Sequence, residues 1–595
     1  MAIKPSTLPR KIIETKTLPP PGRLLRINGS TYVEIAGKRI PIGGRLPELK
    51  PGEKHVRVTS TLCPYCMRLL PGRIVERDGR IYIRKVCPEH GEFEELYYGD
   101  AKLYYRMMKY EETGKGVGDV KAYVGLNAPC PYNCGLCAMH ENHTALANLV
   151  VTNRCDLSCF YCFFYAEKAG YVYEPTLEQL RFQIRQLKKQ NVTLAIQITG
   201  GEPMMRSDLV DIVRMLKEEG VRHIQLNTNG IWFAKTYFDD QEYAIKYTRM
   251  LREAGVNTVY MSFDGVTPKV NWKNHWEVPF TFEVFRKAGM TSVVLVPTVI
   301  KGMNDHELGD IIKFGAKHID IVRSVNFQPV SLSGQLKKKE RERMRITIAD
   351  AINKIAEQTD YQIPPEAWYP IPVAAKFAKF IEAWTEIPQF CMSNHPMCGA
   401  GTYIFVERGA DGVPKRIVPI SEFFDVDAFV EWLEEKRLYL MAGKSRRMLM
   451  LKSAIDLRKF VDSKKMPEGL SFTKLLWNVF IKRNYDALGQ LHYHMMFLGM
   501  MHFMDLYNYD VTRVRRCNIH YTAPDGRIIP FCAYNVLESI YRDYVLKQYS
   551  TDLEAYKKEL DVKTFNPGEK YDRSKYIKLM KNHPIYKEAY KGIIF

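Results

Sequence analysis

The sequence lacks any long hydrophobic run. Its 595 residues contain no stretch of about 18 uncharged apolar residues, the length that a membrane-spanning helix needs. The opening MAIKPSTLPRKIIETKTLPPP has no apolar core of signal-peptide length, and we find no solenoid-type repeat and no low-complexity tract. These absences predict a cytoplasmic protein, either fully in solution or in peripheral contact with the cytoplasmic membrane face.

The composition is that of a globular protein, with 46% hydrophobic and 26% charged residues. The length predicts a principal domain with additions on either side. A formal charge of +19 suits nucleic acid, an anionic membrane or a phosphorylated substrate, and charge alone does not choose among them. Because the basic residues are dispersed and no RNA-binding module is recognised, we expect no nucleic-acid partner.

Thirteen cysteines in a chain without a secretory signal predict metal ligands rather than disulfides, since a reducing compartment keeps thiols free. Nine of them precede residue 165, which concentrates the predicted metal chemistry in the first third of the chain.

The central stretch alternates short apolar strands with amphipathic helices, a pattern that builds a parallel sheet. The predicted strands are 147–151, 193–198, 223–227, 258–263, 292–296 and 324–327. Thr176 and Ser207 are the expected starts of the first two helices. Six such units predict a partial (β/α)6 barrel with its chemistry at the carboxyl ends of the strands.

The sequence TNRCDLSCFYC directly follows the first predicted strand and supplies Cys155, Cys159 and Cys162. A 4Fe-4S cluster held by only three thiolates leaves one iron open for a ligand, here S-adenosylmethionine (SAM). This spacing, together with a later TGGEP, predicts a catalytic cluster that reduces SAM to a 5'-deoxyadenosyl radical. The alternative is a buried cysteine cluster or a zinc site.

Side chains and glycines at the following strand ends are predicted to bind SAM. Gly200 and Gly201 let the backbone approach the methionine moiety, and Glu202 offers an anion to its ammonium group. The full predicted set is Tyr161, Gly200, Gly201, Glu202, Asn227 and Ser262. For Asn227 and Ser262 the alternative role is turn capping.

A second metal site is predicted before the barrel. Cys63 and Cys66, followed after a hairpin by Cys87 and His90, resemble the two knuckles of a zinc ribbon or rubredoxin. Sulfur-rich tetrahedral ligation suits both zinc and iron, so we expect one mononuclear iron or zinc. Alternatively, His90 only caps the turn and a distant cysteine completes the site.

The remaining seven cysteines predict two auxiliary 4Fe-4S clusters. One group repeats the three-thiolate spacing without a GGE of its own, and the late cysteines could converge on another cluster. The two groups are Cys130, Cys134 and Cys137, and Cys391, Cys398, Cys517 and Cys532. Seven cysteines for two clusters require a non-cysteine ligand, a shared arrangement or an open iron; any single late cysteine could instead be a buried thiol.

The predicted fold is therefore α/β: a partial (β/α)6 radical SAM barrel with a rubredoxin- or zinc-ribbon-like module before it and a mainly helical region after it. The helical stretches expected there include AFVEWLEEKRLYL, SRRMLMLKSAIDLRKFV, FTKLLWNVFIKR and ALGQLHYHMMFLGMMHFM. The expected divisions are an arm (1–55), the ribbon module (56–125), an auxiliary cluster segment (126–146), the core (147–365), the helical region (366–550) and a tail (551–595).

Together these motifs resemble the archaeal tetraether lipid synthase family of radical SAM enzymes. The resemblance spans roughly residues 60 to 540. It is carried by CPYC with CPEHG, CPYNCGLC, NRCDLSCFYC, AIQITGGEP, SVVLVPTVIKGMND, VNFQPVSLSG, LHYHM, MHFMD and RCNIHYTAPDGRIIPFCAYN.

The resemblance implies carbon–carbon bond formation between terminal methyl carbons of the phytanyl chains of two archaeal diether (archaeol) phospholipids. It also implies three 4Fe-4S clusters with one mononuclear iron, and a reduced donor such as ferredoxin or flavodoxin. Such a reaction requires an apolar tunnel and a cationic place for the lipid head group.

Two other functions remain open. One is different radical SAM alkyl chemistry, such as methylation of a pterin or bridging within one tetraether. The other is an RNA-modifying or nucleic-acid-binding iron–sulfur protein.

Overall fold

The structure is a computed structural model. It describes residues 21–117, 124–164, 169–190, 194–332, 337–409, 413–446, 456–467, 494–552 and 570–595, with a few single residues between these ranges. Within this part of the chain no helix is both long enough and apolar enough to cross a membrane.

The centre of the molecule is a parallel sheet whose six strands confirm the six that the sequence predicts. They are β8 (Leu146–Thr152), β10 (Ala195–Gly200), β11 (His223–Thr228), β12 (Thr258–Ser262), β13 (Val293–Val296) and β15 (Val322–Pro329). Each pairs in parallel with the next in that order. All the carboxyl ends therefore meet at one edge, where a parallel barrel places its chemistry.

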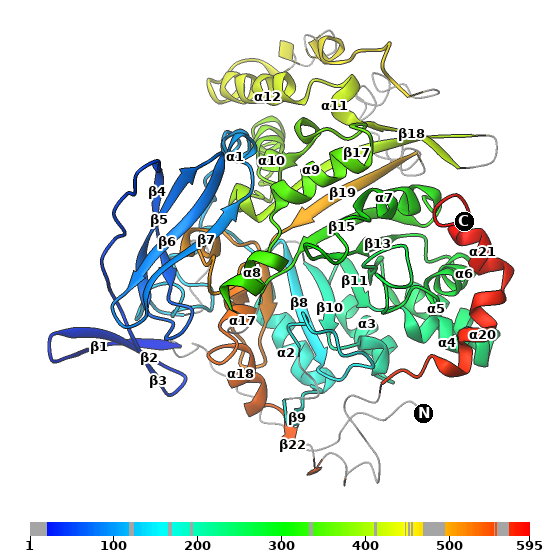
Figure 1. Cartoon of the computed structure of the whole chain (residues 1–595), viewed down its shortest axis with the longest axis horizontal. Helices are drawn as coiled ribbons and strands as arrows, with labels where there is room; N and C mark the ends of the chain where they lie inside the picture. Colours follow the sequence, from blue (N-terminus) through cyan, green and yellow to red (C-terminus); the bar gives the residue numbers. More distant parts are fainter. Residues whose placement is uncertain are drawn as a thin grey trace.

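Helices cover the outer face of this sheet (Figure 1). They are α2 (Leu177–Lys188), α3 (Leu209–Glu218), α4 (Ile231–Asp239), α5 (Gln241–Ala254), α6 (Val278–Ala288) and α7 (Leu308–Lys317). Thr176 caps α2 as expected, accepting a hydrogen bond from the backbone of Gln179. For α3 the N-cap is Asp208, one residue after the predicted Ser207.

The region after the barrel adds strands to both edges of its sheet. Strand β19 (Met495–Met501) pairs in parallel with β15, and β20 (Ile519–Thr522) pairs in parallel with β8. Beyond them lie the antiparallel β17 (Gly399–Arg408), β18 (Pro414–Pro419) and β21 (Ile528–Pro530). Strands β19 and β20 therefore extend the predicted six-stranded parallel sheet at its two edges, and the two-residue β14 (Thr298–Val299) also pairs in parallel with β15.

Among the helices expected in this region, α12 (Val426–Met441) is confirmed and packs on α10 (Val373–Thr385). The predicted helix ending in MMFLGMMHFM is wrong from Met495 on, because these residues form β19. The backbone N–H and C=O groups of β19 pair with those of β15 on one side and β17 on the other. Sheet pairing therefore overrides the helical pattern. FTKLLWNVFIKR lies outside the described residues.

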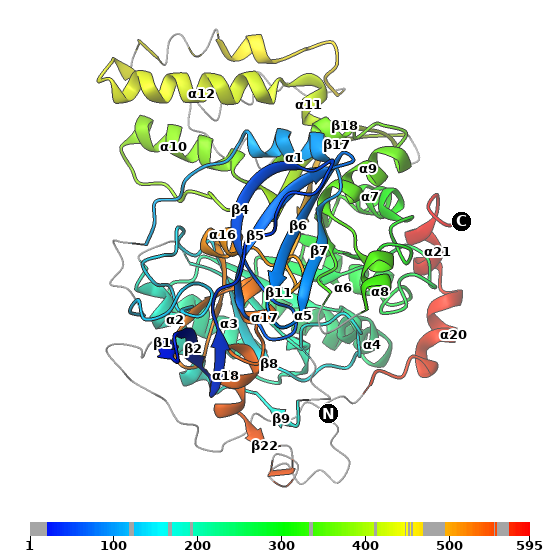
Figure 2. The same ribbon diagram turned by 60° about the vertical axis from the view of Figure 1, so that its left-hand side comes forward.

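The N-terminal module is a four-stranded antiparallel sheet beside the barrel (Figure 2). It consists of β4 (Lys54–Leu62), β5 (Leu69–Arg77), β6 (Arg80–Cys87) and β7 (Gly91–Tyr98). Within the predicted arm, residues 22–41 form a separate small sheet of β1 (Gly22–Ile27), β2 (Ser30–Ile35) and β3 (Lys38–Pro41). Buried ion pairs from Glu95 of β7 to Arg341 and Arg345 tie the module to the rest of the protein.

The end of the chain packs against the barrel. Its helices α20 (Ser574–Asn582) and α21 (Pro584–Tyr590) contact each other, and α21 contacts α6. Tyr576, Tyr586 and Tyr590 are buried there. Residues 574–590 of the predicted tail therefore form two helices whose buried tyrosines pack on the protein.

Candidate active site

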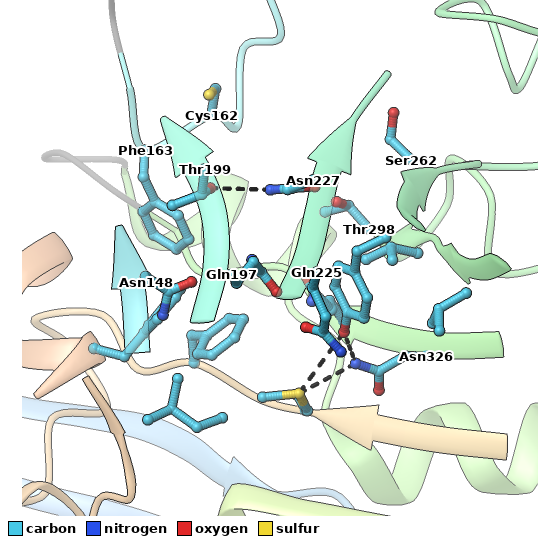
Figure 3. Close-up of a pocket in the computed structure, with 18 of the residues that line it drawn as sticks. Asn148, Cys162, Phe163, Gln197, Thr199, Gln225, Asn227, Ser262, Thr298 and Asn326 are labelled. Atoms are coloured by element: carbon cyan, nitrogen blue, oxygen red, sulfur yellow. Dashed lines mark hydrogen bonds between the residues drawn. The ribbon is translucent and has the colours of Figure 1, made fainter. Parts of the chain in front are cut away.

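A cavity of about 520 Å³ lies at the carboxyl ends of the barrel strands. Figure 3 shows part of its lining. Cys155, Cys159 and Cys162 line it together with every predicted SAM-binding residue, namely Tyr161, Gly200, Gly201, Glu202, Asn227 and Ser262. The fold thus brings to one place residues that are spread over more than 100 positions of the sequence.

The three cysteines stand on the loop that follows β8. Backbone N–H groups of Leu157 and Phe164 donate to the sulfurs of Cys155 and Cys162 over 3.5 and 3.3 Å. Burial raises the pKa of all three thiols, that of Cys159 to about 11. A positively charged metal centre would offset this burial and hold the sulfurs as thiolates, so the donor set fits an iron–sulfur cluster.

Gly200 and Gly201 let strand β10 approach this loop closely. Gly200 has a φ of +132°, and a Cβ at Gly200 would lie 2.0 Å from the backbone oxygen of Thr152. A Cβ at Gly201 would lie 2.0 Å from the backbone oxygen of Arg154. Backbone N–H groups of Gly201 and Glu202 instead donate to these oxygens over 2.8 and 2.7 Å. The glycines therefore hold the beginning of the cysteine loop.

Glu202 is a buried carboxylate held by three donors. It accepts hydrogen bonds from the backbone of Met204 and Asn229 and from the Thr228 hydroxyl, over 3.0, 2.7 and 2.9 Å. Burial and the neighbouring Asp156 raise the pKa of Glu202 to about 8. A cationic ligand beside the two carboxyl groups would stabilise their ionised forms and lower the pKa of Glu202. The ammonium group of SAM is a ligand of this kind.

A polar network connects the cysteine loop to the fourth strand end. The Tyr161 hydroxyl donates to Asp264, and Lys273 forms an ion pair with the same carboxylate over 2.9 Å. Lys273 is buried, and its ammonium lies 5.3 Å from the centre of the Tyr161 ring. Although burial opposes its charge, Asp264 and the Cys159 thiol raise the pKa of Lys273. The side chain of Tyr161, a residue of the cysteine loop, is thereby fixed in position.

Amide side chains inside the barrel form a polar floor that the sequence reading missed. Figure 3 shows Asn148, Gln197, Gln225 and Asn326 projecting toward the same space. Asn326 donates to the Tyr260 hydroxyl, and its amide nitrogen lies 3.1 Å from the Met501 sulfur. The sequence does contain a signal for this floor. Alternate residues of a strand share one face, so Gln197 is expected on the same face as Thr199, and Gln225 on the same face as Asn227.

The side of the cavity next to the C-terminal region is apolar. Phe503 stacks on Phe531 with ring centres 3.9 Å apart, and Phe163 meets Phe531 edge-on at 5.7 Å. The other apolar lining residues there are Ile371, Phe497, Met500, Met501 and Ile519. The cavity therefore offers hydrogen-bonding amides on its floor and a hydrophobic wall beside them.

The four predicted ribbon ligands converge with tetrahedral spacing. The sulfurs of Cys66 and Cys87 are 3.8 Å apart, and Nδ1 of His90 lies 3.6 Å from Cys63 and 3.5 Å from Cys87. A tetrahedron of 2.3 Å metal–sulfur bonds has edges of about 3.8 Å. Burial opposes ionisation of Cys87, but hydrogen bonds led by that from His90 lower its pKa to about 7. These four residues fit one mononuclear metal ion.

The first auxiliary group gathers at a small separate pocket. Cys130, Cys134 and Cys137 line it with His140 and Pro530. Cys130 and burial raise the pKa of Cys134. Three thiols on one pocket fit an additional iron–sulfur site.

The late cysteines converge only in part. Burial, Cys532 and Cys398 raise the pKa of Cys517, and Nε of the buried Arg513 donates to the Cys398 sulfur over 3.4 Å. Burial raises the pKa of Cys391, and the groups that act on it most strongly after burial are Lys379, Ser393, Lys115 and Glu112. Charge interactions thus link Cys398, Cys517 and Cys532, which makes these three the candidate thiols of the second auxiliary group.

Comparison with known proteins agrees with this geometry. Residues 149–315 match the radical SAM superfamily, and residues 55–99 match the HMPTM N-terminal zinc ribbon domain. The 7,8-dihydro-6-hydroxymethylpterin dimethyltransferase of Methanocaldococcus jannaschii is 42% identical over 510 residues, 84% of this chain and 97% of that protein. The GTP 3',8-cyclase of Limosilactobacillus fermentum is 32% identical over 200 residues, 32% of this chain and 56% of that protein.

The solved structure of Streptococcus suis SuiB shares 16% identity with a TM-score of 0.29, covering 37% of this chain and 47% of that one.

The chain belongs to the radical SAM superfamily and, within it, to the family of the M. jannaschii dimethyltransferase. The predicted radical SAM barrel with an N-terminal ribbon is thereby confirmed. The relative that spans the chain is described as a pterin dimethyltransferase rather than a tetraether synthase, so the lipid reaction stays a prediction.

Proposed function

We propose that this chain is a radical SAM enzyme whose substrate is a reduced pterin, which it methylates at carbon. One SAM molecule supplies the 5'-deoxyadenosyl radical that removes a hydrogen atom from that carbon, and a second SAM molecule supplies the methyl group and leaves as S-adenosylhomocysteine. The reductant provides one electron for each SAM consumed. The observation that carries the proposal is the 42% identity to a pterin dimethyltransferase over 97% of that protein. The amide floor of the cavity supports it. Asn148, Gln197, Gln225 and Asn326 can each donate and accept, as the edge of a pterin ring requires.

The residues around the cysteine loop take defined roles. A 4Fe-4S cluster on Cys155, Cys159 and Cys162 would deliver one electron to the SAM sulfonium and so release methionine and a 5'-deoxyadenosyl radical. Glu202 holds the ammonium group of SAM, while the glycines before it hold the beginning of the cysteine loop. Tyr161, fixed by Asp264, borders the same space. Burial of these groups keeps water away from the radical.

The remaining metal sites belong to the proposal. Cys130, Cys134 and Cys137 hold one auxiliary 4Fe-4S cluster, and Cys398, Cys517 and Cys532 hold the second. Each has three cysteine ligands, so each leaves an iron for a further ligand. Cys63, Cys66, Cys87 and His90 hold a single zinc or iron.

A second candidate is the joining of archaeol-type lipid chains into a tetraether. The apolar wall formed by Phe163, Phe503 and Phe531 is the observation that favours it, because a phytanyl chain needs a hydrophobic surface. The motifs that resemble tetraether lipid synthases support the same substrate. In this case the enzyme would work in peripheral contact with the cytoplasmic membrane face.

One experiment separates the two substrates. The reconstituted protein is incubated without oxygen with SAM, a reductant and either 7,8-dihydro-6-hydroxymethylpterin or archaeol phospholipid. Mass spectrometry then looks for methylated pterin and for biphytanyl-linked cores released by acid. Methylated pterin that disappears in Cys155→Ala supports the first proposal. Coupled lipid without methylated pterin replaces it by the second, and 5'-deoxyadenosine without either product rejects both substrates.

A further inference from the structure

The last described segment of the chain reaches back to the cysteine loop. Its helices α20 and α21 run along the outside of the barrel beside α4 and α6 (Figure 1). Just before α20, the backbone N–H of Tyr571 donates to the oxygen of Asp156 over 3.0 Å, and Nζ of Lys570 donates to the oxygen of Leu157 over the same distance. Because Asp156 and Leu157 directly follow Cys155, these bonds hold the loop between the first two ligands of the catalytic cluster.

Arg573, two residues after Tyr571, binds a second part of the site. Its Nη2 donates to the backbone oxygen of Lys273 over 2.6 Å, and its Nε lies 2.6 Å from Oε1 of Glu277 in an ion pair. The Glu277 side chain is fully buried, where an unpaired charge would cost free energy. Both acceptors belong to residues 273–277, which lie between β12 and α6.

Residues 273–277 in turn contact several parts of the catalytic cavity. Lys273 lines the cavity and pairs with the carboxylate that accepts the hydrogen bond of the Tyr161 hydroxyl. The buried side-chain amide of Asn274 donates to the backbone oxygens of Asn229 and Ser262 over 2.7 Å each. The place of this segment therefore fixes the Tyr161 side chain and the carboxyl ends of β11 and β12 relative to one another.

We propose that Arg573 is a positioning residue of the catalytic site. It fastens residues 273–277 to the same end of the chain that holds the cysteine loop, and so keeps Lys273 and Tyr161 in register with the cluster and with bound SAM. Arg573 is not among the described residues that line the cavity, so it acts through these neighbours. The inference rests on the family's catalytic cluster and not on the substrate proposed above.

The test uses the cluster-loaded full chain without oxygen and without any substrate. Arg573→Gln should keep its iron content and bind SAM about tenfold more weakly, the order of effect of removing the outer partners of metal ligands. The change that saturating SAM produces in the EPR spectrum of the reduced protein should also differ from that of the wild type. A purely structural role would lower only the urea midpoint and leave both SAM readouts as they are.

Lys575→Ala is the matched control, because Lys575 lies two residues further along and pairs with Asp239 on α4 instead. It should leave the SAM affinity and the EPR change unaltered. If Arg573→Gln does not fold because Glu277 is left buried without its partner, Arg573→Gln combined with Glu277→Gln removes that charge. The double variant should recover stability and still bind SAM weakly.

Wild-type SAM affinity together with a wild-type EPR change, in the single variant or in the double variant, overturns the proposal. Turnover of a substrate does not enter the test, so a wrong substrate assignment leaves its outcome intact.

Discussion

Replacing Glu202 with glutamine separates the binding of SAM from the stability of the fold. Burial and Asp156 raise the pKa of Glu202 to about 8 from an ordinary value of 4.5. The protonated carboxyl is therefore favoured until a cation arrives. If SAM binds the ionised form through its ammonium group, its apparent affinity should fall about tenfold for each pH unit below 8.

The same shift predicts an opposite effect on stability without SAM. A carboxyl whose pKa is raised on folding contributes stability below its unfolded pKa, and this stability is lost as pH rises through the folded value. Between pH 5 and 8 the loss approaches about 1.4 kcal/mol for each unit. Glutamine is neutral like the protonated side chain, so Glu202→Gln should remove this slope and weaken SAM binding. Its NH2 group cannot accept the hydrogen bond that the backbone of Asn229 donates to the carboxylate, and the loss of this bond offsets the gain in stability at pH 8.

Both effects can be measured on the cluster-loaded protein without oxygen. Calorimetric titration with SAM at pH 6, 7 and 8 gives the affinity, and urea unfolding at the same pH values gives the stability. Asp264→Asn is a useful comparison, because that carboxylate already has Lys273 as its cation. A SAM affinity independent of pH in the wild-type protein, or unaltered in Glu202→Gln, would refute the assignment of Glu202 to the ammonium group.

The other sites give three further predictions. Gly201→Ala should prevent SAM binding and displace the cysteine loop, since its Cβ would meet the backbone oxygen of Arg154 at 2.0 Å. SAM titration and iron content measure the two effects, and normal values for both would contradict the assignment. Cys517→Ala should lower bound iron by about one cluster whereas Cys391→Ala should not, which elemental analysis decides; equal iron in both variants would contradict the grouping. His90→Ala should release the ribbon metal and lower the melting temperature, because a structural metal site contributes folding free energy. If the variant keeps its metal, a residue other than His90 is the fourth ligand.

The sequence was most informative where spacing and periodicity are local. The cysteine loop, the GGE after the second strand and the six core strands follow from short patterns that tertiary contacts reinforce. All the predicted SAM-binding residues line one cavity because the carboxyl ends of parallel strands meet. The ribbon ligands could also be predicted from the sequence, since a hairpin places its two knuckles together.

Features that depend on distant segments could not be predicted in the same way. Met495–Met501 reads as part of an amphipathic helix and becomes a strand because two sheet partners lie beside it. Nothing local separates Cys391 from Cys398 and Cys532, and only the folded chain shows which thiols interact electrostatically. The contact of Lys570 with the cysteine loop joins positions more than 400 residues apart.

The central claim is that this site uses a SAM-derived radical to remove a hydrogen atom from its substrate. Its most direct test is incubation without oxygen with SAM, reductant and fully deuterated candidate substrates, followed by mass analysis of the 5'-deoxyadenosine formed. The account predicts deuterium in 5'-deoxyadenosine from one of the substrates, and no 5'-deoxyadenosine at all from Cys159→Ala. Product formed from a deuterated substrate without deuterium in 5'-deoxyadenosine would contradict it.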